Sequence, residues 1–238
     1  MKEVLFSSPD QPCFIGGWYM KDIELCDAIV EAFNSDCFPK GQGTVGGGPN
    51  KRVAPEIKES TDGSLYNRCD LADAYLKNLQ SVLELYKEKF PYSNDTEPYY
   101  LDQLNIQKYE KGNSYAGWHS ERTHNSPRHL VYMTYLNDIE EGGETEFFHQ
   151  KIKIQPRKGL TLIWPVDWTY CHRGCAAPNE EKFIITGWYN FFENVNDWKA
   201  EKPLDRDGVV ASHEDVFVYK DKNTNAPSKL PTLNSVST

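Results

Sequence analysis

A chain of 238 residues with 39% hydrophobic and 13% aromatic residues can bury a substantial core, and its aromatic content favours a β-rich fold. The formal net charge of −9 argues against DNA, RNA or an anionic membrane as the main partner. No apolar run is long enough to span a membrane, and residues 1–10 lack the apolar core of a secretory signal. Six scattered cysteines, without paired Cys-x2-Cys modules, favour reduced thiols in the cytoplasm over a structural zinc site.

Two amphipathic helices are predicted in the N-terminal part of the chain. Asp22 is a suitable N-cap for a helix over residues 23–34. A second helix runs from Asp70 to about Phe90 and is ended by Pro91, which cannot continue it. The apolar residues at helical spacing are Ile23, Cys26, Ile29, Val30 and Phe33 in the first helix and Leu71, Tyr75, Leu79, Val82, Leu83 and Tyr86 in the second. We expect both helices to support a sheet.

Between the two helices lies a glycine-rich loop, Gly41 to Gly48. A phosphate-binding P-loop would need Gly-Lys-Ser/Thr at the start of a helix, and this pattern is missing. We therefore expect a mobile loop rather than a phosphate site. Residues 52–60 are expected to be extended, and the loop together with residues 51–62 is a candidate lid over a substrate.

From about residue 99, short runs of β-branched and aromatic residues alternate with turn signals. Two helices followed by many short strands predict an α+β, mainly β fold: a double-stranded β-helix (jelly roll) with N-terminal support helices. We divide this single domain into a support region with the lid loop (1–98), a β-helix core (99–192) and a partly flexible C-terminal extension (193–238). The predicted strands are 101–109, 129–136, 145–148, 151–154, 160–164 and 183–192.

Three side chains of the core can together bind a metal ion. In an extended segment residues i and i+2 point to the same side, so His119 and Glu121 can reach one ion. His172 is expected in a loop after the strand 160–164, where a barrel can bring it to the same mouth. Two imidazoles and one carboxylate with open positions suit iron(II). A His-x-Glu pattern alone is weak support, because two histidines can fall near strands by chance.

Lys182 follows His172 by ten residues and opens the apolar run Phe183–Trp188. A lysine that faces a core needs an anionic partner, because an unpaired buried charge is very unfavourable. A dicarboxylate that chelates the metal at one end would supply such an anion at its other end. The alternative is that Lys182 only begins a strand and faces solvent.

Further motifs accompany these residues at fixed spacings. They are Tyr109-x9-His119-x-Glu121, Tyr135-Leu136-Asn137-Asp138, Glu141-Gly142-Gly143-Glu144-Thr145-x-Phe147, Pro156-x-x-Gly159 and His172-x9-Lys182-x5-Trp188. In their order and spacing they resemble the prolyl 4-hydroxylase branch of the iron(II)/2-oxoglutarate dioxygenases. The resemblance covers about residues 99–192.

The resemblance implies roles for eight residues of this chain. Lys182 would pair with the distal carboxylate of 2-oxoglutarate, and Tyr135 would donate its hydroxyl to the same carboxylate. Tyr109 would face the iron pocket, while Thr145 and Trp188 would line the co-substrate cavity. The implied catalytic metal ligands are His119, Glu121 and His172, and the implied co-substrate-binding residues are Lys182, Tyr135, Tyr109, Thr145 and Trp188.

Glu121 departs from the family pattern, which usually has aspartate at this position. Its side chain is one methylene longer, so it must bend, or the strand must recede, for the carboxylate to reach the metal. Tyr115 stands four residues before His119, where the family more often has three, which predicts a local bulge. Both departures bear on how a substrate is aligned.

The resemblance implies an enzyme that uses Fe(II), 2-oxoglutarate and O2, with ascorbate as a candidate further cofactor, to hydroxylate an unactivated C–H bond. It points first to prolyl 4-hydroxylation of a peptide or protein, and leaves open another peptide side chain, a free amino acid or a small molecule. Two rival interpretations are a non-catalytic, cupin-like metal- or ligand-binding barrel and a zinc hydrolase, which would favour a His-Glu-x-x-His helix that is missing here. The sequence leaves the oligomeric state open.

Overall fold

The computed structural model describes residues 1–8, 10–35, 38–46, 50–94, 99–101, 103–122 and 126–191. The predicted C-terminal extension, residues 193–238, lies outside these ranges, so its expected flexibility stays a prediction. In the described part of the chain no helix is long and apolar enough to cross a membrane.

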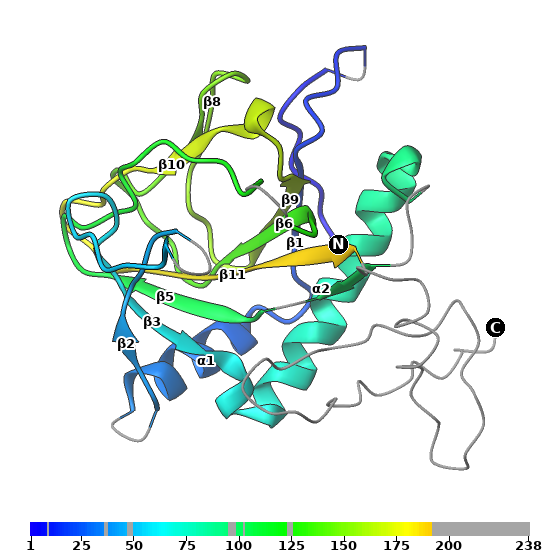
Figure 1. Ribbon diagram of the computed structural model, residues 1–238. Coiled ribbons are helices and arrows are strands. Elements are labelled where there is room, and N and C mark those ends of the chain that lie inside the picture. Colours follow the sequence, from blue (N-terminus) through cyan, green and yellow to red (C-terminus); the bar gives the residue numbers. More distant parts are fainter. Residues whose placement is uncertain are drawn as a thin grey trace.

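Two antiparallel sheets enclose the interior of the fold (Figure 1). The major, eight-stranded sheet has the order β1 (Gly16–Tyr19), β9 (Leu160–Pro165), β6 (Arg128–Tyr135), β11 (Lys182–Phe191), β5 (Asn105–Tyr109), β3 (Thr61–Ser64) and β2 (Gly41–Gln42), and β4 (Tyr99–Leu101) also pairs with β11. The minor sheet has the order β10 (His172–Gly174), β7 (Thr145–Phe147) and β8 (Ile152–Ile154). This arrangement confirms the predicted jelly roll.

Both helices, α1 (Glu24–Asn34) and α2 (Cys69–Lys89), lie on the outer face of the major sheet (Figure 1). A chain of buried hydroxyls fixes α2 to the sheet: the Tyr75 hydroxyl is 2.7 Å from Thr134 Oγ1, which is 2.7 Å from Thr161 Oγ1. Three short 3-10 helices complete the described helical structure: η2 (Leu65–Asn67), η3 (Pro91–Asn94) and η4 (Trp168–Tyr170).

The alternation of side chains along the strands separates two cores. On β6, Leu130 and Tyr132 pack against the helices, whereas Val131, Met133 and Tyr135 face the space between the two sheets. Because successive side chains of a strand point to opposite faces, a central strand covered on both sides is largely apolar. The inner core is the one that surrounds the candidate site.

The two predicted helices are confirmed, and each begins and ends within about one residue of its expected bounds. The Asp22 carboxylate accepts a hydrogen bond from the Leu25 amide at 3.3 Å, as expected for a cap. The assignment of Ile23 to the buried face is wrong: its side chain is 41% exposed. Ile23 directly precedes α1, and its backbone is already helical (φ −76°, ψ −28°).

Three predictions about the strands need correction. The expected strand 101–109 is two strands, β4 and β5. Residues 52–60 are not continuously extended, because Ala54 accepts backbone hydrogen bonds from Ile57 and Lys58 and forms a turn that contains Pro55. His172 does not lie in a loop but begins β10.

The described part of the candidate lid forms several regular contacts. β2 pairs with β3, and Val45 forms an antiparallel bridge with Arg52. Residues 47–49, which include the end of the loop, lie outside the described ranges, and the proposed mobility of this loop stays a prediction.

Gly187 allows the close approach of β11 to its neighbours. An added Cβ would overlap the Gln103 carbonyl oxygen and the Tyr132 hydroxyl, which are themselves hydrogen-bonded to each other. We expect Gly187→Ala to lower the free energy of unfolding by about 1–3 kcal/mol, the usual range for overpacking a core. Gly41→Ala is the matched control, because nothing lies within 4 Å of an added Cβ there. Equal urea midpoints for the two variants would show that β11 is not tightly constrained at Gly187.

Candidate metal centre

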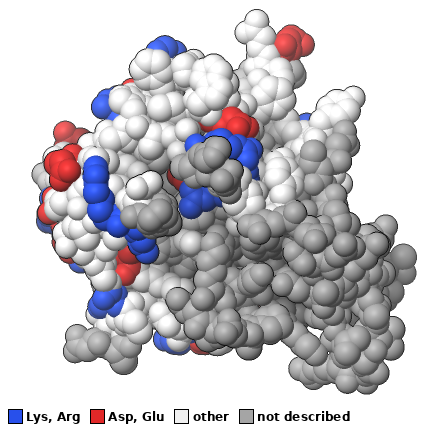
Figure 2. All heavy atoms as spheres, in the orientation of Figure 1, with Lys and Arg blue, Asp and Glu red and all other residues white. Residues whose placement is uncertain are grey.

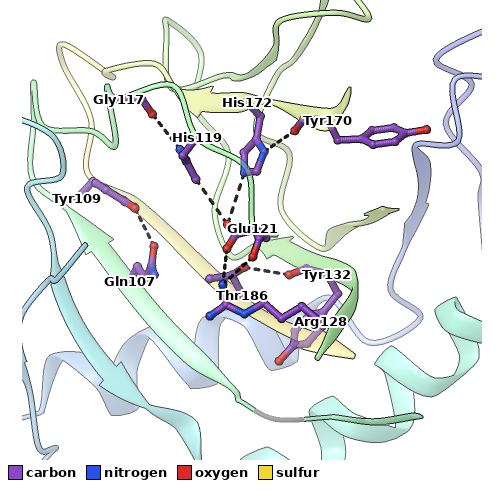
Figure 3. Close-up of polar contacts among 10 residues, drawn as sticks. All are labelled: Gln107, Tyr109, Gly117, His119, Glu121, Arg128, Tyr132, Tyr170, His172 and Thr186. Carbon is purple, nitrogen blue, oxygen red and sulfur yellow. Dashed lines mark hydrogen bonds and ion pairs between the residues drawn. The ribbon is translucent and has the colours of Figure 1, made fainter. Parts of the chain in front are cut away.

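A backbone bridge between two distant segments creates the candidate site. His119 and His172 are an antiparallel pair that exchange both backbone hydrogen bonds, at 3.0 and 2.8 Å. Their imidazole rings therefore lie on the same side, with centroids 4.3 Å apart. Two residues further on, the Glu121 amide donates to the Val166 carbonyl at 3.1 Å. The three side chains point toward one another at the mouth of the inner core (Figure 3).

Each imidazole is oriented by a backbone carbonyl. Nδ1 of His119 is 2.8 Å from the Gly117 oxygen, and Nδ1 of His172 is 2.9 Å from the Tyr170 oxygen. Because a carbonyl oxygen only accepts, each Nδ1 carries the proton and each Nε2 keeps its lone pair. The Nε2 atoms lie 3.6 and 3.9 Å from Glu121 Oε1, and one donor atom from each of the three side chains lies within 4.8 Å of the others. This is the geometry of three ligands on one face of a metal ion.

Burial keeps the two imidazoles neutral. It lowers the pKa of His172 to about 4 and that of His119 below its ordinary value, and the neighbouring imidazole lowers the His172 pKa further. Glu121 acts in the opposite direction on both rings, but burial has the larger effect. At neutral pH both Nε2 lone pairs are therefore available to a metal.

Arg128 holds the carboxylate of Glu121. Its Nη1 lies 2.9 Å from Glu121 Oε2 and 3.3 Å from the Glu121 carbonyl oxygen. The guanidinium also stacks 3.5 Å from the ring centroid of Trp188. One carboxylate oxygen is thus bonded to Arg128 while the other faces the imidazoles (Figure 3). Sequence reasoning missed Arg128, although it opens an apolar strand just as Lys182 does.

Lys182 is buried in the same inner core, with 4% of its surface exposed. Its Nζ bonds the carbonyl oxygens of Gly143 at 3.0 Å and Cys175 at 3.5 Å and lies 5.0 Å from the ring centroid of Tyr109. Among the described residues no carboxylate lies within ion-pair distance of it, and burial lowers its pKa to about 8. The pocket therefore has an ammonium group that an anion would stabilise, and the interpretation of Lys182 as a solvent-facing strand end is wrong.

The predicted co-substrate residues Tyr135 and Thr145 meet beside this ammonium. The Tyr135 hydroxyl donates to Thr145 Oγ1 at 2.7 Å and approaches the Ile154 carbonyl oxygen at 3.2 Å. Thr145 pairs with Gly174, the residue before Cys175. Both side chains are buried, so their hydroxyls can be redirected only toward a bound polar group.

Tyr109 and Trp188 lie on different sides of the pocket. Tyr109 is buried next to Lys182 and donates its hydroxyl to Gln107 Oε1 at 2.7 Å. Trp188 is six residues from Lys182 along β11, a separation of about 20 Å in a strand. The structure places it against Arg128 and against the inner core that contains Tyr109 and Tyr135, and its place in the co-substrate cavity stays a prediction.

The candidate lid borders the metal segment. Residues 57–59 exchange backbone hydrogen bonds with residues 114–117, and Lys58 bridges Tyr115. Tyr115 stacks in parallel on His119, with ring centroids 3.8 Å apart. The Lys58 ammonium is buried and paired with Asp62 at 2.8 Å, so the charge of this lysine, unlike that of Lys182, is already balanced.

A family model of the 2OG-Fe(II) oxygenase superfamily matches residues 104–190. This part of the chain is therefore similar to a 2OG-Fe(II) oxygenase domain. In sequence it is similar to two proteins of Arabidopsis thaliana: probable prolyl 4-hydroxylase 9 (24% identical over 193 residues, 69% of this chain) and prolyl 4-hydroxylase 13 (25% over 136 residues, 45% of this chain). The matches span 64% and 49% of these relatives, less than two thirds of either.

Solved structures of prolyl hydroxylases share the fold of the oxygenase domain. A prolyl-4-hydroxylase of Pseudomonas putida is 16% identical with a TM-score of 0.56, and the alignment covers 75% of this chain and 92% of that one. A prolyl hydroxylase of Trichoplax adhaerens, in complex with a peptide fragment of the hypoxia-inducible factor oxygen degradation domain, is 16% identical with a TM-score of 0.57, covering 74% and 83%. The resemblance to the prolyl 4-hydroxylase branch is confirmed.

The oxygenase family uses Fe(II), 2-oxoglutarate and O2, and the residues of this chain fit the first two. His119, His172 and Glu121 would hold Fe(II), because two neutral imidazoles and a carboxylate offer their free atoms to one point. Lys182 would hold the distal carboxylate of 2-oxoglutarate, because its buried ammonium bonds only carbonyl oxygens among the described residues.

Removing Arg128 should weaken metal binding. In Arg128→Met the Glu121 carboxylate loses the bond that orients it, and we expect the affinity for Co(II), an oxygen-stable substitute for Fe(II), to fall about 10- to 100-fold. Arg122→Met is the matched control, because that arginine pairs with Asp167 at 2.9 Å and not with a metal ligand. Titration with competition from a chelator gives both affinities. Equal Co(II) affinities in the two variants would contradict the role of Arg128.

Binding of 2-oxoglutarate should weaken above about pH 8. The pKa of Lys182 in the empty pocket is lowered to about 8, so the ammonium is present below this pH and lost above it. A dicarboxylate binds the ammonium form, and its Kd should therefore rise by up to about tenfold per pH unit above that pKa. In Lys182→Arg the guanidinium stays charged, so its Kd should not show this rise. Calorimetry on the Co(II)-loaded protein measures both; parallel profiles would rule out Lys182 as the titrating group.

Proposed function

We propose that this protein is an iron(II)- and 2-oxoglutarate-dependent dioxygenase that hydroxylates an unactivated C–H bond of a prolyl residue in a peptide or protein. One observation carries the proposal: the three metal donors and the buried Lys182 ammonium lie in one inner core, with no described carboxylate within ion-pair distance of the lysine. A non-catalytic barrel that binds only a metal would have no need for this buried cation.

The chemistry of the bound Fe(II) converts 2-oxoglutarate, O2 and the C–H bond into succinate, CO2 and the hydroxylated product. The residues of the chain position the reactants. Lys182, with Tyr135 and Thr145, would fix the distal carboxylate and so the direction of the co-substrate. His119 and His172 are held by carbonyls, so their Nε2 atoms need little rearrangement on binding. Arg128 keeps Glu121 from turning away.

A prolyl substrate is supported by the relatives. The named plant, bacterial and animal proteins are all prolyl hydroxylases, and the Trichoplax adhaerens structure contains a peptide. The surface is compatible with peptide binding: despite the net charge of −9, Lys and Arg side chains gather near the middle of the face shown in Figure 2. Ascorbate belongs in the assay as a reductant.

The test is succinate formation from 2-oxoglutarate with Fe(II), ascorbate and proline-containing peptides. Wild-type protein should form succinate and hydroxyproline in equal amounts. In His172→Ala, loss of a ligand should reduce turnover at least about 100-fold. His213→Ala, a histidine without an assigned role, is the control.

Each failure in this assay has a separate meaning. Full turnover by His172→Ala would refute the metal site. Wild-type succinate formation that is stimulated by another peptide or a small molecule, but by no proline peptide, would refute the prolyl substrate and leave the oxygenase assignment intact.

A further inference from the structure

A row of exposed aromatic side chains lies outside the site described above. It consists of Trp118, Phe148, His149 and Trp168, and we refer to it as the aromatic row. Successive ring centroids are 5.2, 5.1 and 5.6 Å apart, and successive rings are nearly perpendicular, at 85°, 82° and 85°. Trp118 is 40% exposed, Phe148 44% and Trp168 69%. Water therefore reaches three large apolar rings that lie side by side.

The aromatic row occupies the outer side of the wall that carries the metal ligands. Trp118 precedes His119, and Phe148 follows Phe147, whose ring is buried 5.6 Å from that of His172. Trp168 begins η4, and the Phe148 amide bonds the Cys171 carbonyl at 2.8 Å, just before His172. Neighbouring residues of an extended segment point to opposite faces. At the His119–His172 bridge the two ligands thus face inward and Trp118 and Arg173 face outward, while Phe148 and His149 lie in the turn after β7.

Cations border the row. The Arg173 guanidinium lies 4.5 Å from the Trp118 ring centroid, and the Lys151 ammonium lies 4.3 Å from that of Phe148. On the same outer face, Glu146 pairs with Arg173 at 2.8 Å and Lys153 at 3.8 Å. Asp167, which precedes Trp168, pairs with Arg122 at 2.9 Å. Four cations and two anions among the described residues give this part of an acidic protein a positive balance, which suits acidic residues in a partner.

Chance exposure does not account for the row. Single exposed apolar side chains are normal, and Tyr92, 85% exposed, is an example. However, eight large hydrophobic residues are exposed in the described part of the chain, and three of them meet in this one place. Contiguous exposed aromatics mark interaction surfaces, because leaving them in water costs free energy that a partner can recover.

We propose that the aromatic row is a docking surface for an extended, proline-rich segment of the protein's own substrate, with acidic residues near its prolines. This inference rests on the proposed prolyl hydroxylase function. Proline-rich segments form polyproline II helices that bind aromatic grooves with little loss of entropy. Such a helix rises about 3.1 Å per residue, so about five residues would cover the row.

The position of the row beside the site favours the substrate over an unrelated partner. Trp118 is adjacent to a metal ligand, so one continuous peptide can contact the row and still place another proline at the metal. Binding at the row then makes entry into the site intramolecular and raises the effective concentration of the reacting proline. A peptide too short to contact the row and the metal site at once does not have its affinity for the metal site raised by the row.

The experiment compares two peptides with Trp168→Ala and wild-type protein. One peptide has about five residues, about 15 Å in polyproline II, and the other has about twenty, about 60 Å, with interspersed glutamates. Trp168→Ala should raise KM for the long peptide about tenfold and leave kcat and the short-peptide KM unchanged. Tyr92→Ala, which removes an exposed ring outside the row, should change neither KM nor kcat for either peptide. Because Trp168 is mostly exposed, its removal should not impair folding.

Direct binding separates this inference from the proposed function. Calorimetry with the long peptide should show binding that Trp168→Ala weakens about tenfold. Such binding without hydroxylation of any peptide would support proline-rich docking at the row and refute prolyl hydroxylation. Equal KM changes for both peptides, or no change for either, would overturn the docking role. Sedimentation that shows a wild-type dimer and a Trp168→Ala monomer would assign the row to a second copy of the chain and also overturn it.

Discussion

The pair of backbone hydrogen bonds between His119 and His172 determines the organisation of the site. Direct opposition in an antiparallel bridge places both imidazoles on one face and within 4.3 Å, before any metal is considered. The same register places their neighbours Trp118 and Arg173 on the other face, 4.5 Å apart. One backbone contact thus fixes the inner metal face and the outer aromatic row together. Without the bridge, the segments that carry His119 and His172, which are far apart in sequence, would not be held side by side.

The charged side chains near the site are of two kinds. Glu121 and Lys58 each have an ion-pair partner, Arg128 and Asp62, at 2.9 and 2.8 Å. Lys182 has only carbonyl oxygens, and burial lowers its pKa to about 8. Removing an ion from water costs several kcal/mol unless a partner offsets it. Lys182 is therefore the charge that an anionic ligand can neutralise. The paired charges instead hold the segments around the pocket in place.

Local patterns in the sequence predicted the features that depend on local physics. Helical spacing located both helices, and the chemistry of a cation before an apolar strand singled out Lys182. Long-range pairing was not predictable in the same way. The residues near His172 do not indicate that it begins β10 opposite His119, because the bridge depends on a residue far away in the sequence. Arg128 opens an apolar strand as Lys182 does, but its importance comes from contacts with Glu121 and Trp188 that the local pattern does not give.

Those contacts also explain how the longer acid at position 121 is accommodated. The two oxygens of Glu121 are used on opposite sides, one toward the imidazoles and one bonded to Arg128. An aspartate on this backbone would be shorter by one C–C bond, about 1.5 Å, and could not keep both contacts without a shift of the segment. Arg128 is itself fixed by its stack on Trp188 at 3.5 Å. The length of the Glu121 side chain, its bond to Arg128 and the position of Trp188 therefore depend on one another. A change in any of them would alter where the carboxylate meets a bound metal.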